Sequence, residues 1–363
     1  MKKITKCIFV IVNIAVVAMM LVTGFAAIIN PVSHPYLSLL GFAFPAFLVA
    51  NICFMVFWAL VAPSRLLIPF FGMILAYNPV QYYSPINGYS EVPEGSLKIL
   101  SYNVLNFSSE TIPTEGSHPI LQYLIDSKAD IMCFQEYVRI GGHDSLWNVI
   151  DSLYPYHEEV RSSGYAGPGG AVVAVYSKYP ILSKENIDVE TKANTIGAFT
   201  LDVHGEKVNL INVHLESIGF SEEERQQFND IVRGKKEKSE IKREAKTIVA
   251  KLAQSAVVRA PQADKVAEFI ESKRGERVIL CGDFNDHPLS YVHHTISRSL
   301  TDCYRYSGHW PGFSFHYYSM YVRIDNIMCS EHWKPYGCVV DKSIAYSDHY
   351  PIYCFLNEEN NVE

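Results

Sequence analysis

The first 83 residues carry two long apolar runs. One extends from Cys7 to Ile29 and the other from Ser38 to Ala62, and neither contains a charged residue. Each run is long enough to cross a bilayer as a helix. A cleaved signal peptide explains the first run less well, because the run is too long for a signal core and a second run follows directly. The pattern therefore predicts a membrane anchor over residues 1–83, with two or three transmembrane helices.

A third apolar stretch, Leu66–Tyr83, determines the side of the membrane on which the rest of the chain lies. It is shorter and is interrupted by proline and polar residues, so it could span, re-enter or lie at the interface. The basic residues of this part, which are expected to stay cytoplasmic, are Lys2, Lys3, Lys6 and Arg65. Two spans would leave the remainder in the cytoplasm, and three would place it outside. The mostly apolar stretch with its Tyr-rich end favours an extracytoplasmic domain.

From residue 97 onward the pattern changes to short runs rich in Val, Ile and aromatic residues. A linker with Pro, Gly and Ser, residues 84–96, precedes them. The runs are typical of strands, several of them buried on both faces, and they are Leu97–Val104, Asp130–Gln135, Ala171–Ser177, Thr195–Val203, Val208–His214, Arg277–Cys281, Val322–Cys329 and Tyr350–Leu356. Helical spacing occurs in His118–Lys128 and Gln262–Lys273. We predict an α/β sandwich over residues 97–357, with two packed sheets and helices outside.

Two segments of this part have more than one interpretation. Phe220–Val257 contains charged stretches and an amphipathic helix, so it could be a phosphate-binding basic patch or a solvated helical insertion. Interleaved acidic residues favour the insertion, and Arg259 and Gln262 are expected to open the helix after it. Four glycines could cradle a phosphate, although a tight turn before a strand is the better interpretation. They are Gly164, Gly167, Gly169 and Gly170.

Charge divides the chain at the same place as hydropathy. No Asp or Glu precedes Glu91, whereas the later residues hold all 38 acidic residues and 27 of the 31 Lys and Arg. The first part is therefore +4 and the second −11, which indicates one zone in hydrocarbon and one in water. The eight cysteines show no CxxC or Cys/His spacing. A structural zinc site is therefore unfavoured, disulfides are not indicated, and small buried thiols are expected.

Polar residues stand at the ends of several apolar strands, where they cost desolvation free energy unless they serve a site. They are Asn103, Glu136, His214, Asp283, Asn285, Asp325, Asp348 and His349. Any one of them could be a loop cap. Together they predict a pocket, because strand ends converge on one edge of a sandwich. The carboxylates favour Mg²⁺ or Mn²⁺ over zinc, and the two histidines could supply an acid and a base.

Seven sequence blocks support a family resemblance. They are SYNVLNF, CFQEY, GGAVVAVYSKYPI, NVHLES, CGDFNDHP, RIDNIMCS and SDHYPI. Their order resembles that of the endonuclease/exonuclease/phosphatase superfamily, which includes DNase I-like nucleases and neutral sphingomyelinases. The resemblance covers about residues 97–356. It implies a four-layer α/β sandwich and a divalent-metal-dependent hydrolase of phosphodiester or phosphomonoester bonds. The motifs GxSxG, GxxxxGK[ST] and HExxH are absent, so other hydrolase classes lack their signatures.

The resemblance also implies a role for each polar residue. The metal set is Asn103, Glu136 and Asp348, with the glutamate as the principal Mg²⁺ ligand. The catalytic set is His214, Asp283, Asn285, Asp325 and His349. His349, oriented by Asp325, would activate water or contact the phosphate. His214 would contact the scissile phosphate or protonate the leaving group. Asp283 would position or activate water, and Asn285 would bind a phosphoryl oxygen.

The substrate stays open between lipid headgroups and nucleic acids. A nuclease should carry a basic groove, so the acidic balance and the anchor argue mildly against DNA. Inositol-polyphosphate phosphatases are disfavoured, because the basic, Trp-containing signature of those relatives is absent around the last Asp. The alternatives are an extracytoplasmic nuclease and a non-catalytic membrane scaffold, and the complete polar set argues against the scaffold. Membrane lipids are expected to contact the N-terminal helices, and no obligate protein partner is inferred.

Overall fold

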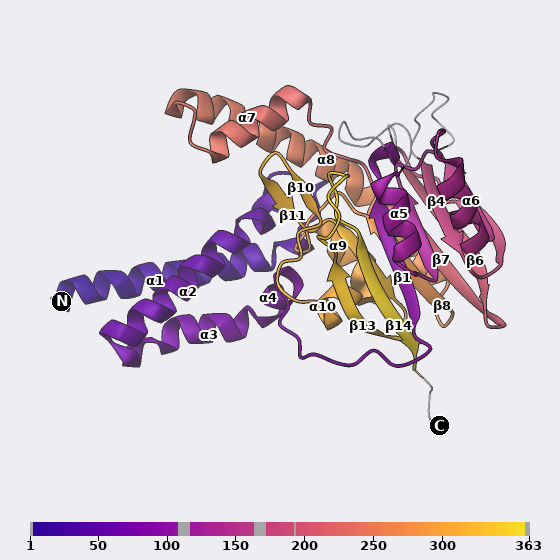
Figure 1. Cartoon of the computed structure of the whole chain (residues 1–363). Helices are drawn as coiled ribbons and strands as arrows, with labels where there is room; N and C mark the ends of the chain where they lie inside the picture. The colour runs from indigo at the N-terminus through magenta and orange to yellow at the C-terminus, as the bar shows by residue number, and fades with distance from the viewer. Residues whose placement is uncertain (1–2, 108–116, 163–171, 192–193, 360–363) are drawn as a thin grey trace.

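Two six-stranded sheets form the centre of the computed structural model, which describes residues 3–107, 117–162, 172–191 and 194–359 (Figure 1). The first sheet has the order β13 (Trp333–Val340), β14 (Ile352–Glu358), β1 (Leu97–Asn103), β2 (Ile131–Gln135), β4 (Val172–Ser177), β3 (Tyr156–Arg161). The second has the order β5 (Ile181–Asn186), β6 (Thr195–Val203), β7 (Glu206–His214), β8 (Arg277–Asp283), β12 (Asp325–Cys329), β9 (Thr301–Asp302). A separate hairpin pairs β10 (Phe315–Tyr317) with β11 (Met320–Val322). The turn predicted at Gly164, Gly167, Gly169 and Gly170 lies outside the described residues.

Each sheet has one parallel pair in its middle. β1 runs parallel to β2, and β7 runs parallel to β8, whereas the other pairings are antiparallel. The amide of Gln135 in β2 donates to Oδ1 of Asn212 in β7 at 2.7 Å, and Asn103 in β1 contacts Asp283 in β8. The carboxyl ends of the four central strands therefore meet at one edge of the sandwich.

Apolar side chains from both sheets fill the space between them. Ile99 and Ile131 of the first sheet meet Leu210 and Ile279 of the second in one buried cluster. Six of the eight cysteines lie in this cluster as free buried thiols, whereas Cys7 and Cys53 on the N-terminal helices are exposed. The expectation of small buried thiols is thus met for those in the sandwich.

Helices cover both outer faces of the sandwich. α5 (Pro119–Asp126) and α6 (Asp144–Leu153) pack on the first sheet, and the second half of α8 (Lys238–Ser272) packs with α9 (Tyr291–Ile296) on the second. Shorter elements are α10 (Cys303–Ser307) and the 3₁₀ helices η4 (Leu105–Phe107) and η5 (Ser297–Ser299). The layers run helices, sheet, sheet, helices (Figure 1). The predicted four-layer α/β sandwich is confirmed.

The charged insertion is helical, as the interleaved charges indicated. It forms α7 (Glu222–Val232), which begins with a capping box between Ser221 and Glu224, and the first half of α8. The expected helix start at Arg259 and Gln262 is wrong, because α8 runs unbroken through Pro261. A proline removes one helical hydrogen bond. Side-chain bonds from Arg259 and Gln262 to the loops of the second sheet fasten the helix at this point.

The N-terminal helices form an antiparallel hairpin followed by a shorter return. α1 (Lys3–Gly24) and α2 (Phe44–Val61) are joined through η1 (Ala26–Ile28) and η2 (Leu37–Ala43). The helical segments Ile4–Ile28 and Leu37–Val61 are long and apolar enough to cross a membrane by length and composition. The third stretch consists of η3 (Pro63–Arg65), α3 (Leu67–Leu75) and α4 (Tyr77–Tyr83), and none of these is long enough alone.

The closed end of this hairpin packs on the sandwich. The ring of Phe42 lies 4.1 Å from the ring of His287, and a Cβ on Gly41 would lie 2.4 Å from an atom of that imidazole. Leu289 joins a buried cluster with Met20 and Phe44 of the N-terminal helices. The N-terminal helices and the sandwich therefore share a packed interface.

Candidate active site

The register of the second sheet sets three polar residues side by side. His214 at the end of β7 pairs with Asp283 at the end of β8, and Asp283 pairs in turn with Asp325 at the start of β12. From the first sheet, Nδ2 of Asn103 donates to Oε1 of Glu136 at 3.1 Å and to Oδ2 of Asp283 at 3.2 Å. Asn103 thus joins the two sheets, and these five residues form one rim.

Two of the predicted residues lie in the left-handed backbone region. Glu136, directly after β2, and Asn285, two residues after β8, both have φ of 51°, which is uncommon for residues other than glycine. The amide N of Asn285 donates to Oδ1 of Asp283 at 2.8 Å, and its Nδ2 donates to the carbonyl of Leu215 at 2.9 Å. These bonds hold the turn after β8 and keep the side chains of Asp283 and Asn285 together at the rim.

Gly282 allows β7 and β8 to approach closely just before the rim. Its φ is +139°, and a Cβ there would lie 1.9 Å from the carbonyl oxygen of Val213. Only glycine fits such an approach without displacing the backbone. The neighbouring pair His214 and Asp283 owes its spacing to this contact.

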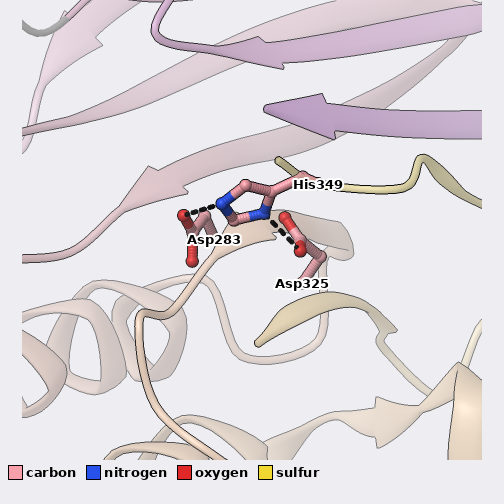
Figure 2. Close-up of side chains that lie close together, drawn as sticks. All are labelled: Asp283, Asp325 and His349. Atoms are coloured by element: carbon pink, nitrogen blue, oxygen red, sulfur yellow. Dashed lines mark hydrogen bonds and ion pairs between the residues drawn. The ribbon is translucent and has the colours of Figure 1, made fainter. Parts of the chain in front are cut away.

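His349 lies between two carboxylates (Figure 2). Its Nδ1 is 2.8 Å from Oδ2 of Asp325, and its Nε2 is 3.7 Å from Oδ2 of Asp283. An ionised carboxylate only accepts hydrogen bonds, so Nδ1 donates. The hydroxyl of Ser347 donates to the carbonyl of Asn103 at 2.8 Å and accepts from the amide of His349 at 3.2 Å. The loop that carries His349 is thereby tied to β1.

His214 faces the same carboxylate oxygen of Asp283 as His349 does. Its Nε2 lies 3.7 Å from Oε1 of Glu136 and 3.8 Å from Oδ2 of Asp283. Its Nδ1 is buried and has no hydrogen-bond partner among the described residues. Two imidazoles therefore flank Asp283, each with Nε2 directed toward it.

Burial and neighbouring charges shift the pKa values of these groups. Burial raises the pKa of Glu136, raises that of Asp283 to about 6, and lowers that of His214. Burial also acts to lower the pKa of His349, but the carboxylates of Asp325 and Asp283 outweigh it and hold that pKa well above its ordinary value. Such displaced pKa values are typical of functional sites, although structural networks produce them too.

All eight residues singled out in the sequence lie at this rim. Six are joined by the contacts above, Asn285 is bonded to Asp283, and Oδ1 of Asp348 lies 4.0 Å from Nε2 of His349. The rim opens into a cavity of about 540 Å³ whose lining includes Glu136, Asp283 and Asp348. The structure thus brings the predicted set together, while the role of each member stays a prediction.

The rim fits a divalent cation. Four carboxylates gather here, and no Lys or Arg among the described residues forms a salt bridge with any of them; they are Glu136, Asp283, Asp325 and Asp348. One oxygen of Asp325 is buried without a hydrogen-bond partner among the described residues. Ligand atoms of Asp283, Asp325 and His349 lie within 4.8 Å of one another, close enough for one ion. Carboxylate oxygens are the ligands that Mg²⁺ and Mn²⁺ prefer.

The sequence pattern did not single out several residues that support the rim. The hydroxyl of Ser314 accepts the amides of Ile324 and Asp325 at 3.1 Å each, which fixes the start of β12. Arg259, which the sequence suggested only as a helix start, is fully buried and pairs with Asp286 in the loop after Asn285. Ser347 precedes two predicted residues and could have been found as part of the SDH block, whereas Ser314 carries no local signal.

Two face-to-face mixed sheets with a polar rim at their carboxyl ends define a sandwich of the DNase I-like class. The sequence profile of the endonuclease/exonuclease/phosphatase family matches residues 100–349, so the chain belongs to that family. Its members are metal-dependent phosphoesterases and nucleases. A second profile, described as a domain of unknown function, matches residues 6–83.

Solved structures are similar to this chain at low sequence identity. The catalytic domain of human nocturnin with bound sulfate has a TM-score of 0.50 and 15% identity over 74% of this chain and 97% of that chain. Humanized D. rerio TDP2 has a TM-score of 0.48 and 16% identity over 72% and 99%. Sphingomyelinase C from Streptomyces griseocarneus has a TM-score of 0.49 and 18% identity over 72% and 99%. Comparison with curated protein sequences finds no match.

Proposed function

We propose that the chain is a membrane-anchored hydrolase of phosphodiester bonds that works with Mg²⁺ or Mn²⁺. One observation carries the proposal. Five strand ends and the loop before β14 deliver two imidazoles and four carboxylates to a single rim, and the rim opens into a cavity. A non-catalytic scaffold has no need for four clustered carboxylates that form no salt bridge with a Lys or Arg among the described residues, since burying them costs free energy of desolvation.

Within this proposal, Glu136 holds the ion together with Asn103 and Asp348. The trio Asp283, Asp325 and His349 is close enough for an ion, but His349 and Asp325 already use each other as hydrogen-bond partners. Glu136 is partly exposed and lines the cavity, so its carboxylate is accessible to an ion and to substrate. A bound divalent ion would polarise a phosphoryl oxygen and offset the charge that develops there.

The remaining residues handle protons and orientation. Asp325 fixes the ring of His349, so that Nε2 faces the rim. His214 presents its own Nε2 to the same centre. The two imidazoles divide the work of accepting a proton from the attacking water and returning one to the leaving oxygen. Asp283 positions that water, and Asn285 binds a phosphoryl oxygen beside it.

The packing of the anchor supports an extracytoplasmic domain. Phe9 stacks on Phe57 at 5.0 Å, so the start of α1 and the end of α2 lie together at the end of the hairpin away from the sandwich (Figure 1). Asn51 bonds to the carbonyl of Pro69, and Pro79 lies against Gly24. α3 and α4 therefore return the chain from the Arg65 side to the sandwich side. With Lys6 and Arg65 in the cytoplasm, three passes place the sandwich outside.

The full chain in detergent, assayed on bis-(p-nitrophenyl) phosphate with and without Mg²⁺, tests the proposed activity. Hydrolysis should require the metal and should be lost in Glu136→Ala and in His349→Ala, while the exposed Glu185→Ala serves as the control. Metal-independent hydrolysis, or hydrolysis unaffected by both substitutions, would contradict the proposal.

A further inference from the structure

We infer that the substrate is a membrane phospholipid, with its phosphodiester at the rim and a hydrocarbon chain in the adjoining cavity. This inference rests on the proposed function and adds the class of substrate. It depends on which parts of the chain build the cavity walls, and these are distant from one another in the sequence.

Three separate elements build the walls, and each contributes apolar side chains. Phe42 and Pro45 come from the anchor, where η2 passes into α2. Phe228 of α7 and Leu252 of α8 come from the insertion, and Met320 comes from the hairpin of β10 and β11. The volume of about 540 Å³ lies within the roughly 300–1,000 Å³ of typical small-molecule sites. The cavity is therefore large enough for an apolar group and has walls that suit one.

The charge of the cavity argues against a nucleic acid. Among the described residues, the lining contains only two Lys or Arg side chains, Arg225 and Arg323. Arg323 is 1% exposed and donates to the carbonyls of Pro311 and Tyr82, so it has little freedom to meet a ligand. A nucleic-acid chain needs several cationic contacts along its phosphates. One available guanidinium suits a ligand with a single phosphodiester.

The position of the anchor wall explains how such a ligand enters. Phe42 and Pro45 belong to Leu37–Val61, one of the two helical segments long enough to cross a membrane. The other end of the cavity is the rim, with Glu136 and His349 in its lining. A hydrocarbon chain lying beside this segment can enter the cavity without full exposure to water, which saves the cost of hydrating apolar surface. The phosphodiester of the same lipid then arrives at the rim.

The test compares chain lengths in the full-length protein reconstituted in lipid nanodiscs with Mg²⁺. The substrates are phosphatidylcholines, phosphatidylethanolamines and phosphatidylglycerols with short or long acyl chains, a single-stranded DNA oligonucleotide, and bis-(p-nitrophenyl) phosphate. Long chains should raise kcat/KM over short chains by about tenfold or more for at least one headgroup, because a long chain covers apolar cavity wall that a short chain leaves in contact with water. Equal turnover of both chain lengths, or preferred turnover of the oligonucleotide, would overturn the inference.

Substitutions in α8 test whether the preference for long acyl chains arises from the cavity wall. Leu252→Glu should lower the ratio of long-chain lipid turnover to bis-(p-nitrophenyl) phosphate turnover by about tenfold. Val249→Glu, on an exposed position of the same helix, should leave the ratio unchanged. Leu252→Trp keeps the wall apolar and fills space, so it should move the preferred chain length downward even if Leu252→Glu fails to fold. An unmoved preference in Leu252→Trp would overturn the inference. Loss of all metal-dependent hydrolysis in the unsubstituted protein would instead contradict the proposed function.

Discussion

Nδ1 of His349 lies 2.8 Å from Oδ2 of Asp325, a residue 24 positions earlier in the chain. Asp325 is itself fixed, because its amide donates to the hydroxyl of Ser314. The bond fixes the orientation of the imidazole, so that the other nitrogen, Nε2, is directed toward Asp283. Ring orientation at the rim therefore depends on a carboxylate that need not touch the substrate.

Asp325→Asn should lower kcat by about a hundredfold while the protein stays folded, because acid–base catalysis by a positioned side chain contributes roughly that much. Activity on bis-(p-nitrophenyl) phosphate across pH measures the effect. If Asp325 acts through His349, the double variant Asp325→Asn/His349→Ala should be no slower than His349→Ala alone. Additive losses would show instead that Asp325 acts independently, for example on the metal.

Glu136→Gln should weaken the binding of Mg²⁺ and remove most activity, because the amide keeps the shape of the side chain and loses its charge. Calorimetric titration of the full chain with Mg²⁺ gives the affinity independently of turnover. Glu159→Gln, a partly exposed residue on the edge strand β3, is the matched control. Unchanged Mg²⁺ affinity in Glu136→Gln would contradict a metal site at Glu136 and would favour a site formed by Asp283, Asp325 and His349.

Gly282→Ala should destabilise the fold by about 3 kcal/mol or more, because the added methyl meets backbone atoms of β7 and φ is +139°. Thermal unfolding measures the loss. Gly141→Ala, at a position where an added Cβ meets nothing within 4 Å, should leave the unfolding temperature nearly unchanged. Equal stability of the two variants would contradict the close approach of β7 and β8.

His287 should make the fold sensitive to mild acid. Burial lowers its pKa to about 4, whereas an unfolded histidine titrates near pH 6.5. Between these values the unfolded chain binds the additional proton, so stability is complete above about pH 6.5 and is lost as pH falls toward 4. The loss amounts to about 3 kcal/mol.

Unfolding midpoints measured from neutral to acidic pH test this expectation. Protonation would place a proton on Nδ1, which already accepts from the amide of Leu289 at 3.2 Å. His287→Gln should flatten the pH dependence in this window, and the exposed His34→Gln should not. If the unfolding midpoint of His287→Gln still falls between neutral and acidic pH, another group causes the acid sensitivity.

Reporter fusions test the proposed side of the membrane. Alkaline phosphatase fused after residue 363 should be active in intact bacteria, and a fluorescent protein that matures only in the cytoplasm should stay dark there. A fusion after Arg65 should give the opposite pattern. Fluorescence from the fusion at residue 363 would show two passes and a cytoplasmic domain.

The sequence predicted the sandwich and the members of the rim, because both are visible as local sequence patterns. Continuous apolar runs indicate central strands, and the polar residue that ends each run is visible in the chain, as at Asn103 and His214. Edge strands leave weaker marks. In β5, five of six residues are exposed or charged, so the strand has no apolar run.

Other features depend on contacts that no local pattern contains. A helix start was expected at Arg259 and Gln262, but the side chains of these two residues fasten α8 to the loops of the second sheet and the helix is continuous. Nothing in the sequence around Ser314 indicates that its hydroxyl accepts a hydrogen bond from the backbone just before β12. The packing of Phe42 on His287 joins residues 245 positions apart, and such long-range pairs cannot be read from spacing.

Because Phe42 and Pro45 line the cavity, the N-terminal helices cannot be exchanged for those of another protein without changing the cavity. If a foreign transmembrane helix replaced residues 1–83, it would hold the sandwich at a bilayer. It would also leave the side of the cavity that Phe42 and Pro45 cover open to water. Such a chimaera should be correctly localised and still handle long-chain lipids poorly. The segment that we propose to hold the chain in the bilayer thus also completes the cavity beside the rim.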